Sequence, residues 1–159
     1  MEPKNGGLDK TDRALLRAVS ANARVSGAAL AAELGVAEST VSLRLRRLQS
    51  LGYIRGYHAD IDLVALGASI QALIAVRLVR HARKEVDAFR KTAPTWPGVL
   101  ALYHMAGADD YLLHVAAAGA SELREFVLRY LAQHPAVAHT ETNMIFEHVA
   151  APGWRELLA

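Results

Sequence analysis

Residues 26–48, SGAALAAELGVAESTVSLRLRRL, decide the fold of the first part of the chain, because they predict two short helices joined by a tight turn. Apolar residues recur at steps of three and four on one face of the first helix: Ala28, Leu30, Ala31 and Leu34. Gly35 follows at once, where a helix end often needs a positive φ. A second apolar stripe marks the second helix and consists of Val41, Leu45 and Leu48.

The outer face of the second helix begins with small hydroxylated residues and becomes cationic further on. Small polar side chains can approach base edges in a major groove, and arginines reach phosphates or guanines. We therefore predict a helix-turn-helix whose DNA-binding residues are Ser39, Thr40, Ser42, Leu43, Arg44, Arg46 and Arg47. The alternative is an ordinary helix pair with a solvated charged face, since a fold supplies an arrangement and not a function.

The flanking sequence supports a three-helix DNA-binding unit. Asp9 or Thr11 can cap a preceding helix that runs through Ala23. An alternating, aromatic-rich segment at 53–58 follows the helices and predicts a strand or small wing. From Arg44 to Arg55 there are four arginines and no acid, so the basic charge is local. We assign residues 1–62 to this domain and its linker strand.

Composition indicates a soluble cytoplasmic protein. The 159 residues carry a formal net charge of +2, too little for indiscriminate polyanion binding. The absence of cysteine excludes disulfides and thiolate metal sites. The start, MEPKNGG, lacks the pattern of an export signal. The longest apolar stretch, 63–76, is too short to cross a bilayer, so we expect no membrane partner.

Beyond residue 62 the periodicity predicts a second domain, 63–159, with the order strand, helix, strand, strand, helix, strand. The expected strands are Ser69–Val79, Val99–Ala106, Asp110–Ala117 and Val137–Val149, and the expected helices are Arg83–Ala93 and one capped by Ser121. Two βαβ halves of this kind form a ferredoxin-like sandwich, which makes the chain an α+β protein. Because the first strand is apolar on both faces, the uncovered sheet face is expected to form a homodimer.

Several motifs together resemble the Lrp/AsnC family, the leucine-responsive and asparagine-operon regulators. The opening Leu8-Asp9-x-x-Asp12-x-x-Leu15-Leu16 and the run from Arg46 to Tyr57 resemble that family's helix-turn-helix and linker. Gly107-Ala108-Asp109-Asp110-Tyr111-Leu112-Leu113 is similar to its G-x-x-D-Y/L signature, and Thr140-x-Thr142 also fits. The resemblance extends from Leu8 to about Val149.

This resemblance implies a transcriptional regulator that binds double-stranded DNA, forms dimers that assemble into tetramers or octamers, and takes a small effector, commonly an amino acid, between dimers. It implies no cofactor. The expected effector-binding residues are His104, Met105, Gly107, Ala108, Asp109, Asp110, Thr140 and Thr142. The alternatives are a solvated hairpin turn for the loop, strand packing for His104 and Met105, and cross-strand pairing for the threonines.

Three features depart from the family pattern. Ala37 stands where a serine or threonine usually caps the recognition helix, so that helix begins uncapped, at a cost of about 1 kcal/mol, or Ser39 caps a shortened one. Leu43 stands where a polar residue is common and could contact a thymine methyl group or a sugar. The tail, 153–158, is either a short packing helix or an oligomer contact.

The sequence leaves two other function classes open. Tetrapyrrole decarboxylases of related architecture would need histidines and arginines around a large pocket, but the seven histidines are scattered and none repeats at metal-ligand spacing. No nucleophile–base–orienter set is visible, so we expect neither an enzyme nor a metal site. An effector-binding module without DNA binding is disfavoured by Arg44, Arg46 and Arg47 on one helix.

Overall fold

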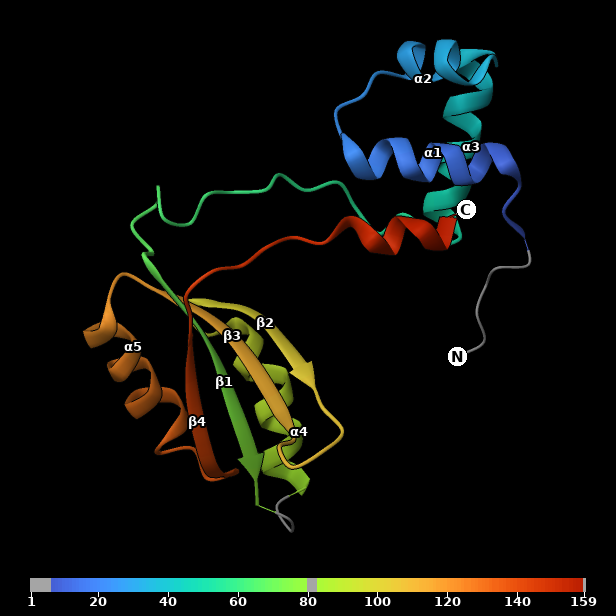
Figure 1. The fold of residues 1–159 in the computed structure, drawn as a ribbon. Coiled ribbons are helices and arrows are strands. Elements are labelled where there is room, and N and C mark those ends of the chain that lie inside the picture. Colours follow the sequence, from blue (N-terminus) through green and yellow to red (C-terminus); the bar gives the residue numbers. More distant parts are fainter. Residues whose placement is uncertain (1–6, 80–82, 159) are drawn as a thin grey trace. The chain divides into compact units, whose positions relative to one another are not determined.

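The computed structural model describes residues 7–79 and 83–158 and divides into two compact units, each with its own core (Figure 1). The first unit comprises the residues up to Asp60 together with those from Ala150 onward, and the second comprises Ile61–Val149. This division differs from the predicted domains 1–62 and 63–159 mainly at the tail, which contacts the N-terminal helices. Across the described ranges, no helix has the length and apolar character needed to cross a membrane.

Three helices form the N-terminal unit: α1 Lys10–Ala21, α2 Gly27–Leu34 and α3 Glu38–Ser50. Their core contains Leu15, Leu30, Val41 and Leu48, all fully buried. Asp9 caps α1, and its carboxylate accepts the Asp12 N–H at 2.8 Å. Gly35 ends α2 with φ of +63°, as the sequence predicted.

Two local expectations for this unit turn out differently. The segment 53–58 forms no strand, because the N–H groups of Tyr53 and Ile54 both donate to the Leu48 carbonyl at the end of α3. Ala28 is exposed, so the apolar face of α2 is narrower than expected. Of the two alternatives given for α3, the uncapped start after Ala37 is the one observed, since Ser39 lies inside the helix and does not shorten it.

The tail forms a short helix, η4 Pro152–Leu158, that packs on α1. Arg17 Nη1 donates to the Leu158 carbonyl at 2.8 Å, and Arg155 Nη2 donates to the Ser20 carbonyl at 3.0 Å. Leu158 joins the edge of the N-terminal core. Of the two alternatives for the tail, the packing helix is the one observed within a single chain.

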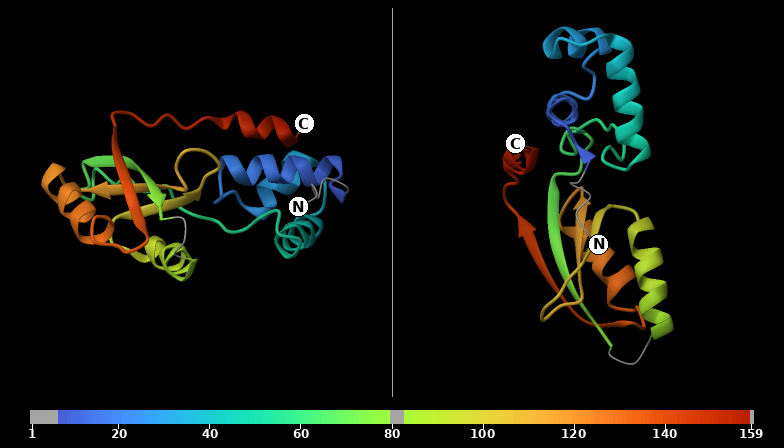
Figure 2. Two further views of the ribbon diagram at one scale, coloured as in Figure 1. Left: turned by 90° about the horizontal axis from the view of Figure 1, so that it is seen from below. Right: turned by 90° about the vertical axis from the view of Figure 1, so that its right-hand side faces the viewer.

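The second unit is a four-stranded antiparallel sheet with both helices on one face (Figure 2). The strand order is β2-β3-β1-β4, that of a ferredoxin-like sandwich, as the sequence predicted. Its elements are β1 Ile70–Leu78, α4 Arg83–Thr92, η2 Ala93–Thr95, β2 Val99–His104, β3 Tyr111–Ala117, α5 Ala120–Phe126, η3 Val127–Leu131 and β4 Val137–Ile145.

The C-terminal core lies between the sheet and these helices. Alternate residues of β1 and β3 point inward, and Phe89 of α4 lies completely buried among Trp96, Tyr111 and His134, with ring centroids 5.3 to 5.6 Å apart. The opposite residues of the same strands, among them Leu73 and Leu112, are half-buried on the face that no described helix of this unit covers.

Element ends in this unit were predicted less well than element identities. β2 stops at His104, and β4 stops at Ile145 and not at Val149. Ser121 does not cap α5, since the helix begins one residue earlier and the side chain of Glu122 accepts the Ala118 N–H at 2.6 Å. The N-cap position of α5 is Gly119, and no side chain caps the helix.

Two histidines make the C-terminal unit sensitive to acid. Burial lowers the pKa of His134, whose Nδ1 accepts the Ala136 N–H at 3.1 Å and must therefore be unprotonated. Burial, and secondarily the charge of His148, lowers the pKa of His114 as well. The unfolded chain thus binds these protons more readily than the folded one, so stability is greatest above the unfolded pKa of about 6.5 and falls as pH decreases.

We expect the urea midpoint of the C-terminal unit to fall between pH 7.5 and pH 5.5, measured by Trp96 fluorescence in a Trp154→Phe background. A His134→Gln variant should lose part of this dependence. A midpoint that rises on acidification, or that the variant leaves equally sensitive, would contradict the assignment.

Candidate nucleic-acid and effector sites

The outer face of α3 is the candidate nucleic-acid surface. Ser39, Ser42 and Arg46 are exposed, and Leu43 is 64% exposed, which is high for a leucine in a helix with a well-formed apolar face. Thr40 is half-buried at the start of the same face. The side chains that the sequence assigned to DNA therefore do share one surface, although two of the arginines are engaged elsewhere.

Arg44 and Arg47 are tied to the start of α1. Arg44 Nη1 lies 2.6 Å from Asp9 Oδ2 and 2.9 Å from Asp12 Oδ1, and Arg47 Nη1 lies 3.0 Å from Asp12 Oδ2. The Asp12 side chain is only 1% exposed. These bonds raise the pKa of Arg44, and the Asp12 N–H and Arg44 lower that of Asp9. The two arginines therefore hold α1 against α3.

Arg46 differs from its two neighbours. Its Nε donates to the Ser42 carbonyl at 3.2 Å, within α3 itself, and among the residues that the structure describes Nη1 and Nη2 have no partner. The guanidinium group is therefore held at the helix surface with its terminal donors available. Sequence reasoning grouped the three arginines together; the Asp9-x-x-Asp12 spacing was the signal that two of them had acidic partners.

A second candidate site is a cavity of about 370 Å³ beside the loop between β2 and β3. It contains four of the predicted effector residues, together with five that sequence reasoning did not select. The predicted ones are His104, Gly107, Ala108 and Asp110, and the others are Arg77, Leu78, Val79, Val86 and Tyr111. The ring of His104 stacks on Tyr111 with centroids 4.8 Å apart.

Asp110 fixes the loop to the end of β1. Its Oδ2 accepts the Leu78 N–H at 2.7 Å, and its own N–H donates to the Val76 carbonyl at 3.0 Å. Gly107 has φ of +150°, and nothing lies within 4 Å of the place where a Cβ atom would stand. The backbone at Gly107 is therefore open to a close approach by a ligand.

Arg77 connects β1 to the other side of the loop. Its Nε donates to the Ala108 carbonyl at 3.0 Å, and Nη2 lies 3.3 Å from Asp109 Oδ1. Neither of the two aspartates that we predicted to bind the effector is thus without a partner: Asp109 pairs with Arg77, and Asp110 accepts the Leu78 N–H.

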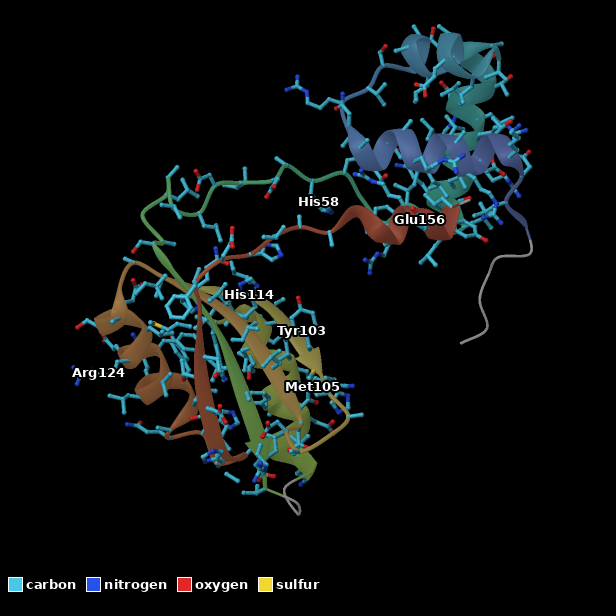
Figure 3. The ribbon with its side chains drawn as sticks, in the orientation of Figure 1. His58, Tyr103, Met105, His114, Arg124 and Glu156 are labelled. Carbon is cyan, nitrogen blue, oxygen red and sulfur yellow. The ribbon has the colours of Figure 1, made fainter. Side chains whose placement is uncertain are left out.

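Four predicted effector residues do not line this cavity. Met105 is exposed where β2 ends (Figure 3), and Asp109 is linked to the cavity only through Arg77. Thr140 and Thr142 lie on β4 opposite Val76 and Ile74, so within the described chain they are cross-strand neighbours of β1.

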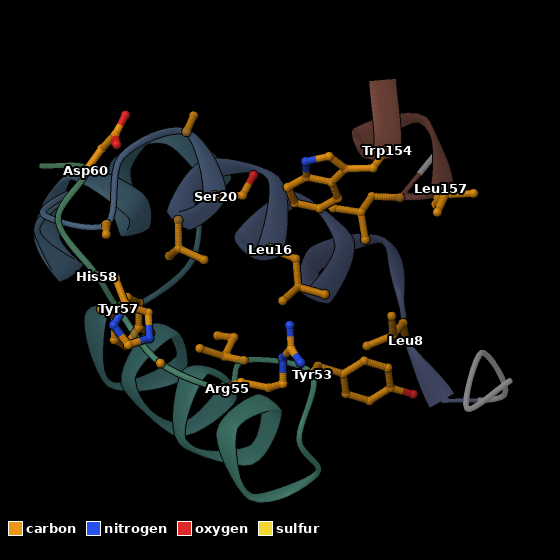
Figure 4. A pocket seen from close by; sticks show the side chains of 16 residues that line it. Leu8, Leu16, Ser20, Tyr53, Arg55, Tyr57, His58, Asp60, Trp154 and Leu157 are labelled. Atoms are coloured by element: carbon orange, nitrogen blue, oxygen red, sulfur yellow. The ribbon is translucent and has the colours of Figure 1, made fainter. Parts of the chain in front are cut away.

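A larger cavity of about 1030 Å³ lies within the N-terminal unit (Figure 4). Leu16 of α1, Trp154 and Leu157 of η4, and Tyr53 and Arg55 of the segment after α3 surround it. Sequence reasoning missed it, because it forms where the tail meets residues about a hundred positions earlier. No cluster of three metal-ligating side chains occurs in residues 7–79 and 83–158.

Comparison with known protein families identifies two domains in the chain. Residues 8–55 match a winged helix-turn-helix DNA-binding domain, and residues 71–154 match the Lrp/AsnC ligand binding domain. The chain belongs to the Lrp/AsnC family. It is therefore a DNA-binding transcriptional regulator with a domain for a small ligand.

Individual relatives of this Lrp/AsnC protein are named as regulators too. It is 44% identical over 142 residues to the HTH-type transcriptional regulator AldR of Mycolicibacterium smegmatis, covering 89% of this chain and 83% of that protein. The crystal structure of MtbAldR aligns with a TM-score of 0.72 and 41% identity, covering 91% of this chain and all of that one. A transcriptional regulator from Neisseria meningitidis, solved as its complex with L-Met, aligns with a TM-score of 0.86 and 27% identity, covering 91% and 94%.

Proposed function

We propose that this regulator binds operator DNA through the exposed face of α3. The observation that carries the proposal is the state of Arg46, whose terminal donors are uncommitted beside exposed Ser42 and Leu43. Ser39 and Thr40 at the start of the helix are small enough to approach base edges, and Arg46 can reach a phosphate or a guanine. Arg44 and Arg47 act mainly by fixing the angle between α1 and α3.

We propose that a homodimer presents two such helices together. The sheet face opposite α4 and α5 is uncovered in the single chain and displays Leu73, Ala75, Leu112 and Ala116 between polar neighbours. A second copy of the same face would bury these residues and satisfy the apolar pattern on both sides of β1. We further propose that the dimers assemble into tetramers or octamers, as the family resemblance implies.

We propose that the effector is an amino acid and that it binds at the cavity beside Gly107 and Ala108, where dimers would meet. Two observations support this: the cavity holds charged groups of both signs, and a structural neighbour was solved with L-Met. We infer that the chain regulates without catalysis or a cofactor, because its two domains are those of regulators, and that it acts in the cytoplasm, where the DNA of bacteria and archaea lies.

Selection of duplexes from a random DNA library by the full-length protein tests the proposal. We expect enrichment of a roughly two-fold-symmetric site, since a dimer presents two α3 helices. A thermal-shift screen of the twenty amino acids should then show at least one that raises the melting temperature by mass action. If no DNA sequence is enriched, the proposed DNA binding is contradicted. If no amino acid raises the melting temperature, the proposed effector is contradicted.

A further inference from the structure

The cavity beside the β2–β3 loop contains a cation that the sequence did not point to. We propose that Arg77 receives the carboxylate of the effector, and that Asp109 occupies the same guanidinium in the free protein as an internal competitor. This inference rests on the proposed effector site and specifies its chemistry: a free α-amino acid with an apolar side chain.

The position of Arg77 suits a carboxylate. It lies near the end of β1, its side chain is 51% exposed, and it lines the cavity directly. Its Nε is held by the Ala108 carbonyl, which fixes the plane of the guanidinium and leaves the terminal nitrogens to other partners. A planar guanidinium binds a carboxylate through two parallel hydrogen bonds, which a hydroxyl or an amide cannot match.

The pair that Arg77 makes now is weak enough to be exchanged. Only Nη2 reaches Asp109, at 3.3 Å, and both side chains are partly exposed. Exposed ion pairs of this kind contribute little to stability. Asp109 lies outside the cavity lining, so a carboxylate arriving from the cavity would approach the guanidinium without displacing the loop backbone.

The remaining walls define the rest of the ligand. Asp110 lines the cavity and uses Oδ2 for the Leu78 N–H, and among the described residues its Oδ1 has no partner, so it can accept from an ammonium group. Leu78, Val86 and Tyr111 supply an apolar wall. A cation, an anion and an apolar wall in about 370 Å³ match a zwitterion with an aliphatic or aromatic side chain.

Exchange would also alter the loop. When a ligand carboxylate takes the guanidinium, Asp109 loses its partner, and the segment around Gly107 keeps only its backbone ties through Ala108 and Asp110. The charge of Asp109 then becomes available at the surface of the loop. Effector binding and the state of Asp109 are therefore coupled through one side chain.

Calorimetric titration of the full-length protein with L-leucine, L-methionine and L-phenylalanine tests this inference. We expect Arg77→Gln to weaken binding of the amino acid that the wild type prefers by about tenfold or more. Asp109→Asn should strengthen binding by about two- to fivefold, because the internal competitor is gone. The corresponding amino acid amide, which lacks the carboxylate, should bind wild type and Arg77→Gln equally weakly.

The matched control is Arg124→Gln, which removes an exposed arginine on α5 of the same unit (Figure 3) and should leave affinity unchanged. Unliganded melting temperatures of all variants check that the fold is intact. Arg77→Lys keeps the positive charge but cannot form two parallel hydrogen bonds, so its affinity for the amino acid should lie between those of the wild type and Arg77→Gln. If amino acids bind the wild type and Arg77→Gln equally, or if Asp109→Asn weakens binding, this inference is wrong and the proposed function stands. If none of the three amino acids binds the wild type, this inference fails, and the proposed effector fails as well only if the thermal-shift screen of all twenty is also negative.

Discussion

Replacing Asp12 by alanine is expected to abolish specific DNA binding although it makes the protein more positive. Asp12 is buried, caps the first turn of α1, and bonds Arg44 and Arg47, whose positions along the chain are 32 and 35 residues away. The substitution removes both of these ion pairs and the capping-box hydrogen bond to the Asp9 N–H, while Arg44 keeps Asp9 and both arginines are partly exposed, so we expect a cost of about 2–3 kcal/mol. The N-terminal unit should lose much of its stability.

Hydrogen exchange of peptides covering α1 to α3 measures this loss directly, and operator affinity should fall by at least about tenfold because the helices no longer hold their geometry. Asp87→Ala, an exposed acid on α4 with the same change in charge, is the control and should alter neither quantity. Unchanged exchange would show that the ion pairs of Asp12 do not hold the helices together. Tighter operator binding by the Asp12 variant would show that Arg44 and Arg47 act mainly by contacting DNA.

Replacing Phe89 by alanine is expected to destabilise the C-terminal unit strongly. Phe89 is fully buried and contacts three rings, those of Trp96, Tyr111 and His134. The substitution leaves a cavity that the rigid sheet cannot close, and Phe→Ala changes in such cores cost about 3–5 kcal/mol. The urea midpoint followed by Trp96 fluorescence, in the Trp154→Phe background, should fall sharply.

Leu128→Ala is the control, because Leu128 lies on η3 of the same unit and its side chain is exposed, so that its loss should change stability by less than about 0.5 kcal/mol. Equal effects of the two substitutions would mean that the packing around Phe89 does not support the sheet. Phe89→Ala should also weaken dimer formation, since the shape of the sheet face proposed to form the dimer depends on how the strands pack on Phe89.

Most of the fold could be predicted because it depends on local patterns. Three- and four-residue apolar spacing identified α1, α2 and α3, and a glycine with positive φ ended α2 where expected. Alternation predicted a strand at β1 that is apolar on both faces, and its residues from Ala72 to Val76 do alternate between buried and half-buried. The shared order of strands and helices then determined the ferredoxin-like topology.

The features that were missed depend on contacts between distant residues. Nothing in the periodicity of α3 distinguishes Arg46 from Arg47; the difference lies in Asp12. Residues 53–58 have the alternation of a strand, but the described part of their unit contains no strand with which they could pair. In the sequence Arg77 is one polar residue in an apolar strand, and only the folded structure shows that it contacts Ala108 and Asp109 of the loop.

The central claim is that the exposed face of α3, with Arg46 at its centre, binds operator DNA. The most direct measurement is the affinity of Arg46→Ala for the selected operator at several salt concentrations, with Arg124→Ala as the control. We expect weaker binding and a salt dependence shallower by about one unit of slope, with unfolding unchanged, because one phosphate contact is lost. An Arg46→Ala variant that binds the operator with wild-type affinity and slope would contradict the account.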